Sequence, residues 1–194
     1  MKQGNTGFTL LELIVAVAIA AILAVIAIPS FTRTIRSNRG VTDANNVLSL
    51  LTMARSEAIK RDTSVSLCVS SDGATCATGT VTWDRGFLLF VDYKSNGNYD
   101  TTSPTTPDLL VRTEVPLSKN STISYATTGG TALTSITFNG LGQLSSTSGA
   151  TGNFVVLPTQ GAGNIFGKRY VVLKQIGRAY VCDPTTNTTC GSGQ

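Results

Sequence analysis

The side chains in this sequence that could do chemistry are its four cysteines, its carboxylates and a few clustered cations. The chain of 194 residues contains no histidine. Histidine is the usual general base near neutral pH and the commonest zinc ligand. Serine and threonine are abundant, but a nucleophile would need a lysine or a terminal amine as its base, and no such motif is present. We therefore expect a protein that is not an enzyme, has no small-molecule substrate and holds no cofactor or metal.

The cysteines form two pairs with the same local spacing, Cys68 with Cys76 and Cys182 with Cys190. Neither pair has the C-x-x-C spacing of zinc ribbons and thioredoxin-type motifs, so two disulfides are the better interpretation. Four cysteines allow three connectivities, and local pairing is favoured because each short segment holds turn-forming residues. Disulfides imply an oxidising compartment such as a bacterial periplasm.

Oxygen-bearing side chains are concentrated between Asp92 and Asp100. Such a segment could hold calcium, but an EF-hand-like loop would need an oxygen ligand where Lys94 stands. A turn around Asn96 and Gly97 needs no metal. We favour the turn and expect no metal site here.

A basic cluster near the end of the chain precedes the acidic residue Asp183 and consists of Lys168, Arg169, Lys174 and Arg178. Strand alternation would put two of these cations, Lys174 and Arg178, on one side of a strand with the rings of Tyr170 and Tyr180. A turn near Gly177 could instead split the strand, and the alternation would then fail. Cations for phosphates and rings for stacking are the usual elements of non-specific nucleic-acid binding. The favoured alternative is a solvated strand edge protected by charge.

The elements that must position these residues begin with an apolar run over residues 8–28, which follows a polar leader at residues 1–7. Its 21 residues make about 31 Å of helix, close to the hydrocarbon thickness of a bilayer. Glu12 lies inside the run, where a carboxylate costs about 2.5 to 3.5 kcal/mol. It needs a partner, and the nearest candidate is the amine that cleavage after Gly7 would create at Phe8.

A helical pattern continues to about Arg61, with apolar residues at three- and four-residue steps: Val41, Ala44, Leu48, Leu51 and Ala58. This half should pack on a globular head. Strand patterns bounded by turn residues follow at residues 64–69, 79–83, 86–91, 108–114, 121–125, 135–138, 154–157, 170–173 and 178–182. The head is therefore expected to be mainly antiparallel β.

The segment Gly7-Phe8-Thr9-Leu10-Leu11-Glu12-Leu13 resembles the prepilin peptidase recognition sequence of type IV pilins and type II secretion pseudopilins. The resemblance implies cleavage after Gly7, N-methylation of Phe8, and contact of Glu12 with the N-terminal amine of a neighbouring subunit. The alternative is an ordinary signal peptide or anchor, with cleavage sites at Ala24 or Ala27, which would leave Glu12 without a purpose.

Short motifs spread over the head resemble the GspH/FimT (FimT/FimU) family of minor pilins: Trp83-Asp-Arg-Gly86-Phe, Phe90-Val-Asp92 with Asn96-Gly97, Ile136-Thr-Phe138-Asn-Gly-Leu-Gly142, and Ile176-Gly177-Arg178. The resemblance implies an α+β, type IV pilin-like lollipop. In it, residues 1–7 are a cleaved leader, 8–29 a transmembrane and filament-core helix, 30–61 an amphipathic helix, and 62–194 a periplasmic β head.

The function implied is that of a minor pilin, a structural subunit that helps to initiate or cap a type IV pilus beside other minor and major pilins. It would be processed by prepilin peptidase in the bacterial inner membrane, with its head in the periplasm. A GspH-kind type II secretion pseudopilin is an alternative. So is a pilus-tip DNA receptor for natural transformation, which in this family uses a basic motif after the Gly-Arg matching Gly177-Arg178, although Tyr180 and Cys182 stand where further arginines would strengthen it.

One feature opposes this orientation. Arg33, Arg36 and Arg39 outnumber Lys2, so the positive-inside rule would place the head in the cytoplasm. The cysteine pairs and the pilin-like leader favour the opposite side, and we follow them.

Overall fold

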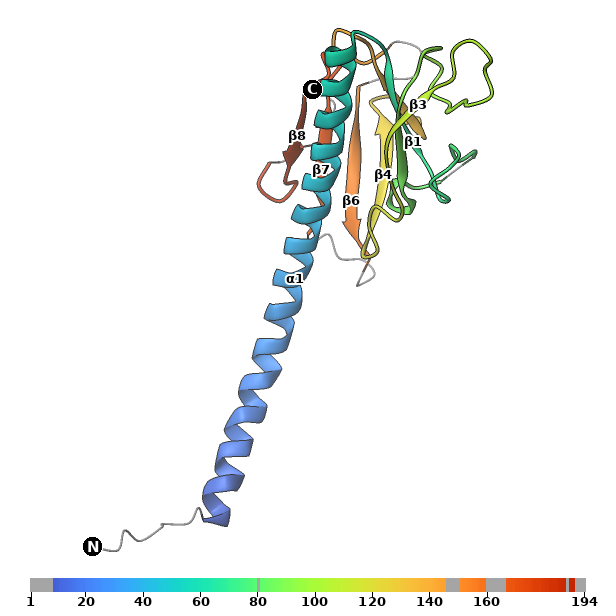
Figure 1. The fold of residues 1–194 in the computed structure, drawn as a ribbon. Helices are drawn as coiled ribbons and strands as arrows, with labels where there is room; N and C mark the ends of the chain where they lie inside the picture. Colours follow the sequence, from blue (N-terminus) through green and yellow to red (C-terminus); the bar gives the residue numbers. More distant parts are fainter. Residues whose placement is uncertain (1–8, 80, 146–150, 160–166, 188, 191–194) are drawn as a thin grey trace, which may run out of the picture.

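One long helix carries a two-sheet head at its C-terminal end. The computed structural model describes residues 9–79, 81–145, 151–159, 167–187 and 189–190, and the side chains of residues 26–30 also lie outside that description. Helix α1 (Leu10–Arg61) has 52 residues. Its N-terminal part extends away from the head, and its C-terminal part packs against it, so the molecule has the shape of a lollipop (Figure 1).

Both ends of α1 are capped by its own sequence. The Thr9 side chain accepts a hydrogen bond from the Glu12 N–H at 3.3 Å, which satisfies one free donor of the first turn. At the other end Asp62 takes a left-handed conformation (φ 49°), and its N–H bonds to the carbonyls of Ala58 and Ile59. The predicted end of the helix, near Arg61, is confirmed.

The head is built from two four-stranded antiparallel sheets. The first, sheet A, has the order β3-β2-β1-β5 and the second, sheet B, the order β4-β6-β7-β8. The strands of sheet A are β1 (Val65–Val69), β2 (Phe87–Val91), β3 (Leu109–Glu114) and β5 (Ser135–Phe138). Those of sheet B are β4 (Ser121–Thr127), β6 (Gly152–Pro158), β7 (Arg169–Leu173) and β8 (Ala179–Cys182).

The predicted strand at residues 79–83 is wrong. A 3-10 turn, η1 (Trp83–Arg85), stands at its end instead. Trp83 is buried, its Nε1 donates to the Leu133 carbonyl at 3.0 Å, and its ring meets the Phe154 ring edge to face at 5.2 Å. Anchoring the large indole in the core explains why the chain turns here rather than extending beside a strand.

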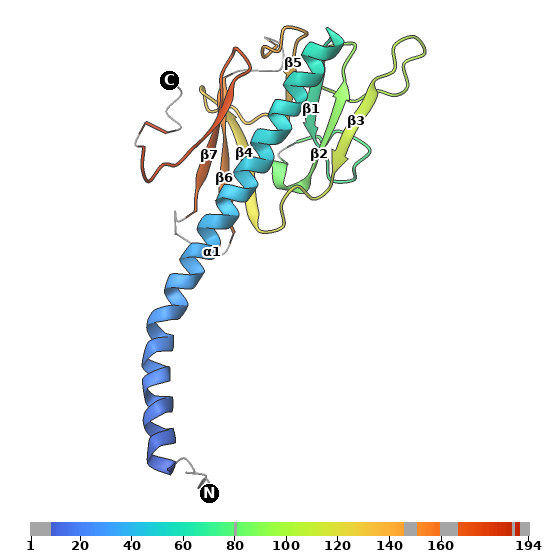
Figure 2. The same ribbon diagram turned by 60° about the vertical axis from the view of Figure 1, so that its left-hand side comes forward.

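The core lies between α1 and the inner faces of both sheets, and Figure 2 shows the helix crossing in front of them. The buried face of α1 consists of Ala44, Val47, Leu50, Leu51, Ala54 and Ala58. Three- and four-residue steps put these side chains on one stripe of the helix. Val41 was predicted on this face but is 37% exposed, because the head begins to cover α1 on a neighbouring side, at Gly40.

Candidate assembly helix and outer surface of the head

The N-terminal part of α1 exposes a continuous apolar surface. Leu10, Leu11 and Val25 are 76%, 73% and 74% exposed, and large apolar side chains between them are exposed as well. A soluble monomer rarely leaves so large an apolar patch uncovered, so this segment calls for an apolar environment or a partner. Glu12 lies within it and is exposed too, which leaves its carboxylate accessible to another chain.

The predicted processing site, Gly7 and Phe8, lies outside the described residues. So do the side chains of residues 26–29, the end of the predicted membrane-spanning segment. Among the described residues no helix is both long enough and apolar enough to cross a membrane.

The head first meets α1 at a close glycine contact. A Cβ built on Gly40 would lie 1.8 Å from the Gly167 carbonyl oxygen, so only glycine fits there. Beside this contact Arg169 forms an ion pair with Asp183 at 3.0 Å and donates from Nη2 to Ser37 Oγ at 3.3 Å. Arg169 therefore faces α1, and Asp183 neutralises its charge. It lies apart from the other predicted DNA-binding cations.

The remaining predicted cations share the outer face of sheet B. The turn at Gly177 does split the strand, as β7 and β8 form a hairpin closed by the bond from the Lys174 N–H to the Arg178 carbonyl at 2.9 Å. Cross-strand partners in an antiparallel pair share a face, and the register pairs Val172 with Tyr180 and Tyr170 with Cys182. This face consequently carries Tyr170, Lys174, Arg178 and Tyr180, and Lys168 Nζ lies 4.8 Å above the centre of the Tyr170 ring.

The tip of this hairpin is fixed to the rest of the head. Gln175 accepts a bond from the Leu144 N–H at 3.0 Å and donates from Nε2 to the Leu144 carbonyl at 2.8 Å. Arg55 on α1 donates from Nε to the Gly142 carbonyl, the group against which Gly177 packs, at 3.0 Å. The helix thus sets the position of the hairpin that presents Lys174 and Arg178.

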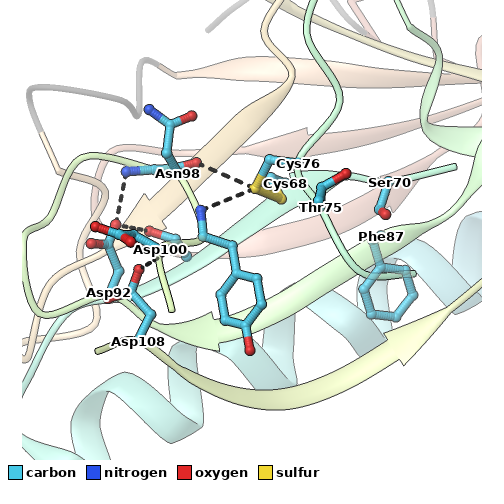
Figure 3. Close-up of a disulfide and its surroundings, with 12 residues drawn as sticks. Cys68, Ser70, Thr75, Cys76, Phe87, Asp92, Asn98, Asp100 and Asp108 are labelled. Carbon is cyan, nitrogen blue, oxygen red and sulfur yellow. Dashed lines mark hydrogen bonds between the residues drawn. A yellow bond between two sulfur atoms is a disulfide. The ribbon is translucent and has the colours of Figure 1, made fainter. Parts of the chain in front are cut away.

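Both cysteine pairs are bridged locally, Cys68 to Cys76 and Cys182 to Cys190. The first bridge, between Cys68 and Cys76, is shown in Figure 3. It belongs to a small second core on the outer face of sheet A, in which Cys76 and Tyr99 pack against Cys68, Leu88 and Phe90. The rings of Phe90 and Tyr99 lie 5.1 Å apart, and the Tyr99 N–H approaches Cys76 Sγ at 3.3 Å. Disulfide and loop together cover a sheet face that would otherwise expose large apolar groups.

The carboxylates of the suspected calcium loop are occupied by donors of the protein itself. Buried Asp92 accepts from Ser66 Oγ at 2.7 Å and from the Gly97 N–H at 2.7 Å, and Ser66 shares a further bond with Thr137. Asp108 accepts from the backbone N–H groups of Tyr93 and Asp100 (Figure 3 shows Asp92, Asp100 and Asp108).

One carboxylate of this loop, that of Asp100, is paired with a cation of the same loop, Lys94. The Lys94 ammonium beside Asp100, with Thr102 donating to the same carboxylate, holds the pKa of Asp100 below its usual range. Burial raises the pKa of Asp108. Among the described residues no group of three or more His, Cys, Asp or Glu side chains is placed to hold a metal ion. No local pattern predicts the buried hydrogen bonds that join Thr137 to Ser66 and Ser66 to Asp92, because Thr137 lies on β5, Ser66 on β1 and Asp92 just past the end of β2.

Two family models match the chain. The type II transport protein GspH family matches residues 43–177, and the prokaryotic N-terminal methylation motif matches residues 2–28. The pilin-like protein PilA1 of Thermus thermophilus is 36% identical over 96 residues, which is 48% of this chain and 53% of PilA1. The chain thus spans about half the length of this curated relative.

The fold agrees with that of a solved structure. The type IV minor pilin FimU of Pseudomonas aeruginosa aligns over 76% of this chain and 91% of FimU, with a TM-score of 0.53 and 19% identity. The minor pseudopilin EpsH of Vibrio cholerae aligns over 75% of this chain and 98% of EpsH, with a lower TM-score of 0.47 and 11% identity. The GspH family model matches most of the chain, and the fold is a helix packed on antiparallel sheets. The chain therefore belongs to the GspH family of pilin-like proteins.

Proposed function

We propose that this protein is a minor pilin, a structural subunit that helps to initiate or cap a type IV pilus. The observation that carries the proposal is the apolar surface of α1 beyond the head, from Leu10 to Val25, in a chain that matches the N-terminal methylation motif. Such a surface suits two successive environments: the bilayer before assembly and the packed helices of a filament afterwards.

Processing follows from the same segment. Prepilin peptidase removes residues 1–7 in the inner membrane, Phe8 becomes the methylated N-terminus, and the head stands in the periplasm, where its two disulfides are stable. Glu12 then pairs with the amine of a neighbouring pilin. A carboxylate without a counter-charge is costly in an apolar setting, so this pair favours one register of subunits.

A non-enzymatic role accords with the head. Histidine is absent from the sequence, and the carboxylates of the loop between Asp92 and Asp108 serve as acceptors for the protein's own donors. The partners we propose are therefore other minor and major pilins rather than a small molecule.

Replacing Glu12 tests the role in assembly. Glu12→Ala should leave the protein folded and in the membrane but remove it from sheared pilus fractions. Glu57→Ala, which removes the same charge from a surface ion pair with Arg61, is the matched control and should assemble normally. Normal incorporation of the Glu12 variant would refute the proposed pairing.

A type II secretion pseudopilus is the alternative location, since the matching family model is that of a type II transport protein. Deleting the gene distinguishes the two systems. Loss of surface pili with normal exoprotein secretion supports the pilus, and the reverse result supports the pseudopilus.

DNA reception is a second candidate function, and the outer face of sheet B favours it. Lys168, Lys174 and Arg178 lie there with Tyr170 and Tyr180, so phosphate contacts and stacking surfaces occur together. Lys174→Glu/Arg178→Glu should reduce DNA binding and transformation while filaments still form. Lys60→Glu/Arg85→Glu makes the same change of charge at two exposed residues outside this face and should have little effect. Binding that does not weaken with salt would contradict this role.

A further inference from the structure

Basic residues are concentrated at the level where α1 leaves the head, near the contact of Arg36 and Gly40 with Gly167. We call this set the basic collar; it consists of Arg33, Arg36, Arg39, Lys119 and Lys168. Helical periodicity puts Arg33 and Arg36 on the same side of α1 as Gly40 and Ala44, the side that packs against the head. Arg36 lies at the edge of the head, where Gly167 packs against its carbonyl, and Arg33 lies one turn of the helix below it.

Contacts place the two lysines of the collar at this same level. Gly167, next to Lys168, packs against the carbonyl of Arg36 and against Gly40, and Arg169 bonds to Ser37. Lys119 precedes Ser121, where β4 begins, and the neighbouring Asn120 carbonyl bonds to the Thr159 N–H just past the end of β6. Strands β4 and β7 start, and β6 and β8 end, at this one edge of sheet B.

The carboxylates nearest the collar are engaged by the head. Asp183 is paired with Arg169, Asp43 accepts from Ser118 Oγ at 3.0 Å, and Asp84 accepts from the Ile123 N–H at 3.1 Å. The collar cations are partly or fully exposed. Asp43 and Asp84 are bonded only to neutral donors, but the five collar cations outnumber them in formal charge, so the lower end of the head presents net positive charge along the direction in which α1 departs.

We propose that the basic collar docks on the phosphates of anionic phospholipids and holds the head against the membrane surface before assembly. The inference rests on the proposed function, in which residues 8–28 occupy the bilayer. At about 1.5 Å per residue, Arg33 then stands about 7 Å and Arg39 about 16 Å beyond Ile28. This spacing covers the headgroup layer and roughly one Debye length above it.

The geometry favours a membrane over a nucleic acid. A partner of the collar must fit into the angle between the helix and the head, and a bilayer crossed by the helix already occupies that angle. Tyr170, which would serve a nucleic acid, contacts the collar through Lys168, but Tyr180 lies on the outer face of sheet B nearer the hairpin. Docking also explains why Arg33, Arg36 and Arg39 lie on the periplasmic side, which the positive-inside rule disfavours for arginine.

The single tryptophan provides the test. Full-length protein is reconstituted into vesicles of phosphatidylcholine alone or with phosphatidylglycerol, both containing a dansyl-labelled lipid. Energy transfer from Trp83 to dansyl then reports how close the head lies to the surface. We expect higher transfer in the anionic vesicles, and loss of the difference at 1 M NaCl, where the Debye length is about 3 Å.

Two matched variants localise the effect. Arg36→Gln/Arg39→Gln should abolish the difference between the two lipids, whereas Lys174→Gln/Arg178→Gln, which removes the same charge at the hairpin far from the collar, should retain it. Equal transfer in both lipids, or equal loss in both variants, would overturn the proposal and favour an acidic surface of a neighbouring subunit or general electrostatics. Failure of the wild type to float with either vesicle would instead overturn membrane anchoring itself.

Discussion

Gly177 and Gly142 approach so closely that a Cβ on Gly177 would lie 1.8 Å from the Gly142 carbonyl oxygen. That oxygen also accepts a hydrogen bond from Arg55 Nε at 3.0 Å. Both glycines have positive φ, 77° and 73°. Two of the short motifs that resemble the family therefore meet in space, and their glycines serve to lock the β7–β8 hairpin to the helix.

Gly177→Ala should destabilise the head strongly, because the substitution adds a clash with backbone to an unfavourable φ. Gly79→Ala is the control, since Gly79 also has a positive φ (84°) but a Cβ there meets nothing within 4 Å. We expect a loss of about 1 to 2 kcal/mol for Gly79→Ala and of about 3 kcal/mol or more for Gly177→Ala. Urea unfolding measures both, and equal losses would contradict the close contact.

The two disulfides allow a comparison at equal loop length, since each joins cysteines with a sequence separation of 8. Chain entropy alone predicts a loss of about 2.5 kcal/mol for either bridge. Cys68→Ala/Cys76→Ala should cost more than Cys182→Ala/Cys190→Ala, because only the first bridge covers Leu88 and Phe90. Denaturant unfolding with increased dye binding to exposed apolar surface would show the difference; identical losses would argue against the second core.

Asp92→Ala should leave the buried Ser66 hydroxyl and the Gly97 N–H without their acceptor. The expected loss is about 3 kcal/mol or more, since a buried donor without a partner costs about 1 to 3 kcal/mol and the lost bonds were to a charge. Asp100→Ala removes a more exposed carboxylate of the same loop and should cost less. Thermal unfolding of the two variants measures both losses of stability. A larger loss in Asp100→Ala than in Asp92→Ala would refute the anchoring role of Asp92.

Calcium should not stabilise the protein, because Asp92, Asp100 and Asp108 already accept bonds from donors within the loop. Tm measured in excess calcium and in EDTA should agree. A higher Tm in calcium, by the mass-action stabilisation that specific binding produces, would reveal a site that replaces these internal bonds.

Alkaline pH should weaken the fold through Tyr125. Burial raises the pKa of Tyr125 above its ordinary value of about 10. The folded state therefore keeps the proton at a pH where the unfolded state releases it, so stability is full below about pH 10 and falls above it, by up to about 1.4 kcal/mol per pH unit. Tyr125→Phe should remove this slope between pH 10 and 11, and Tyr93→Phe, at an exposed ring, should retain it.

The sequence predicted most of the fold because its signals were local. Apolar periodicity predicted α1, and β-rich segments bounded by turns predicted each strand found in the described part of the chain. The one further strand predicted, at residues 79–83, is replaced at its end by a 3-10 turn, because Trp83 is held by a hydrogen bond to Leu133, 50 residues away. The sequence could not predict how the basic cluster is divided, because that depends on distant contacts. Arg169 appeared in a basic cluster, yet its partners Ser37 and Asp183 come from α1 and from beyond β8.

The residues of the outer face of sheet B could be predicted only in part. The sequence left open whether a turn near Gly177 breaks the alternation that puts Tyr170, Lys174, Arg178 and Tyr180 together. The hairpin preserves the shared face because Lys174 and Arg178 close it as opposite partners. A register of this kind depends on how two strands pair, which local periodicity does not reveal.

The most direct test of the proposed role is the N-terminus of the mature protein. Intact-mass and N-terminal analysis of protein from wild-type cells should find a methylated Phe8 as the first residue, and the same analysis of cells lacking prepilin peptidase should find the uncut chain. An N-terminus at Met1 in wild-type cells, or cleavage near Ala27, would contradict the account and leave an anchored or secreted β domain outside any filament.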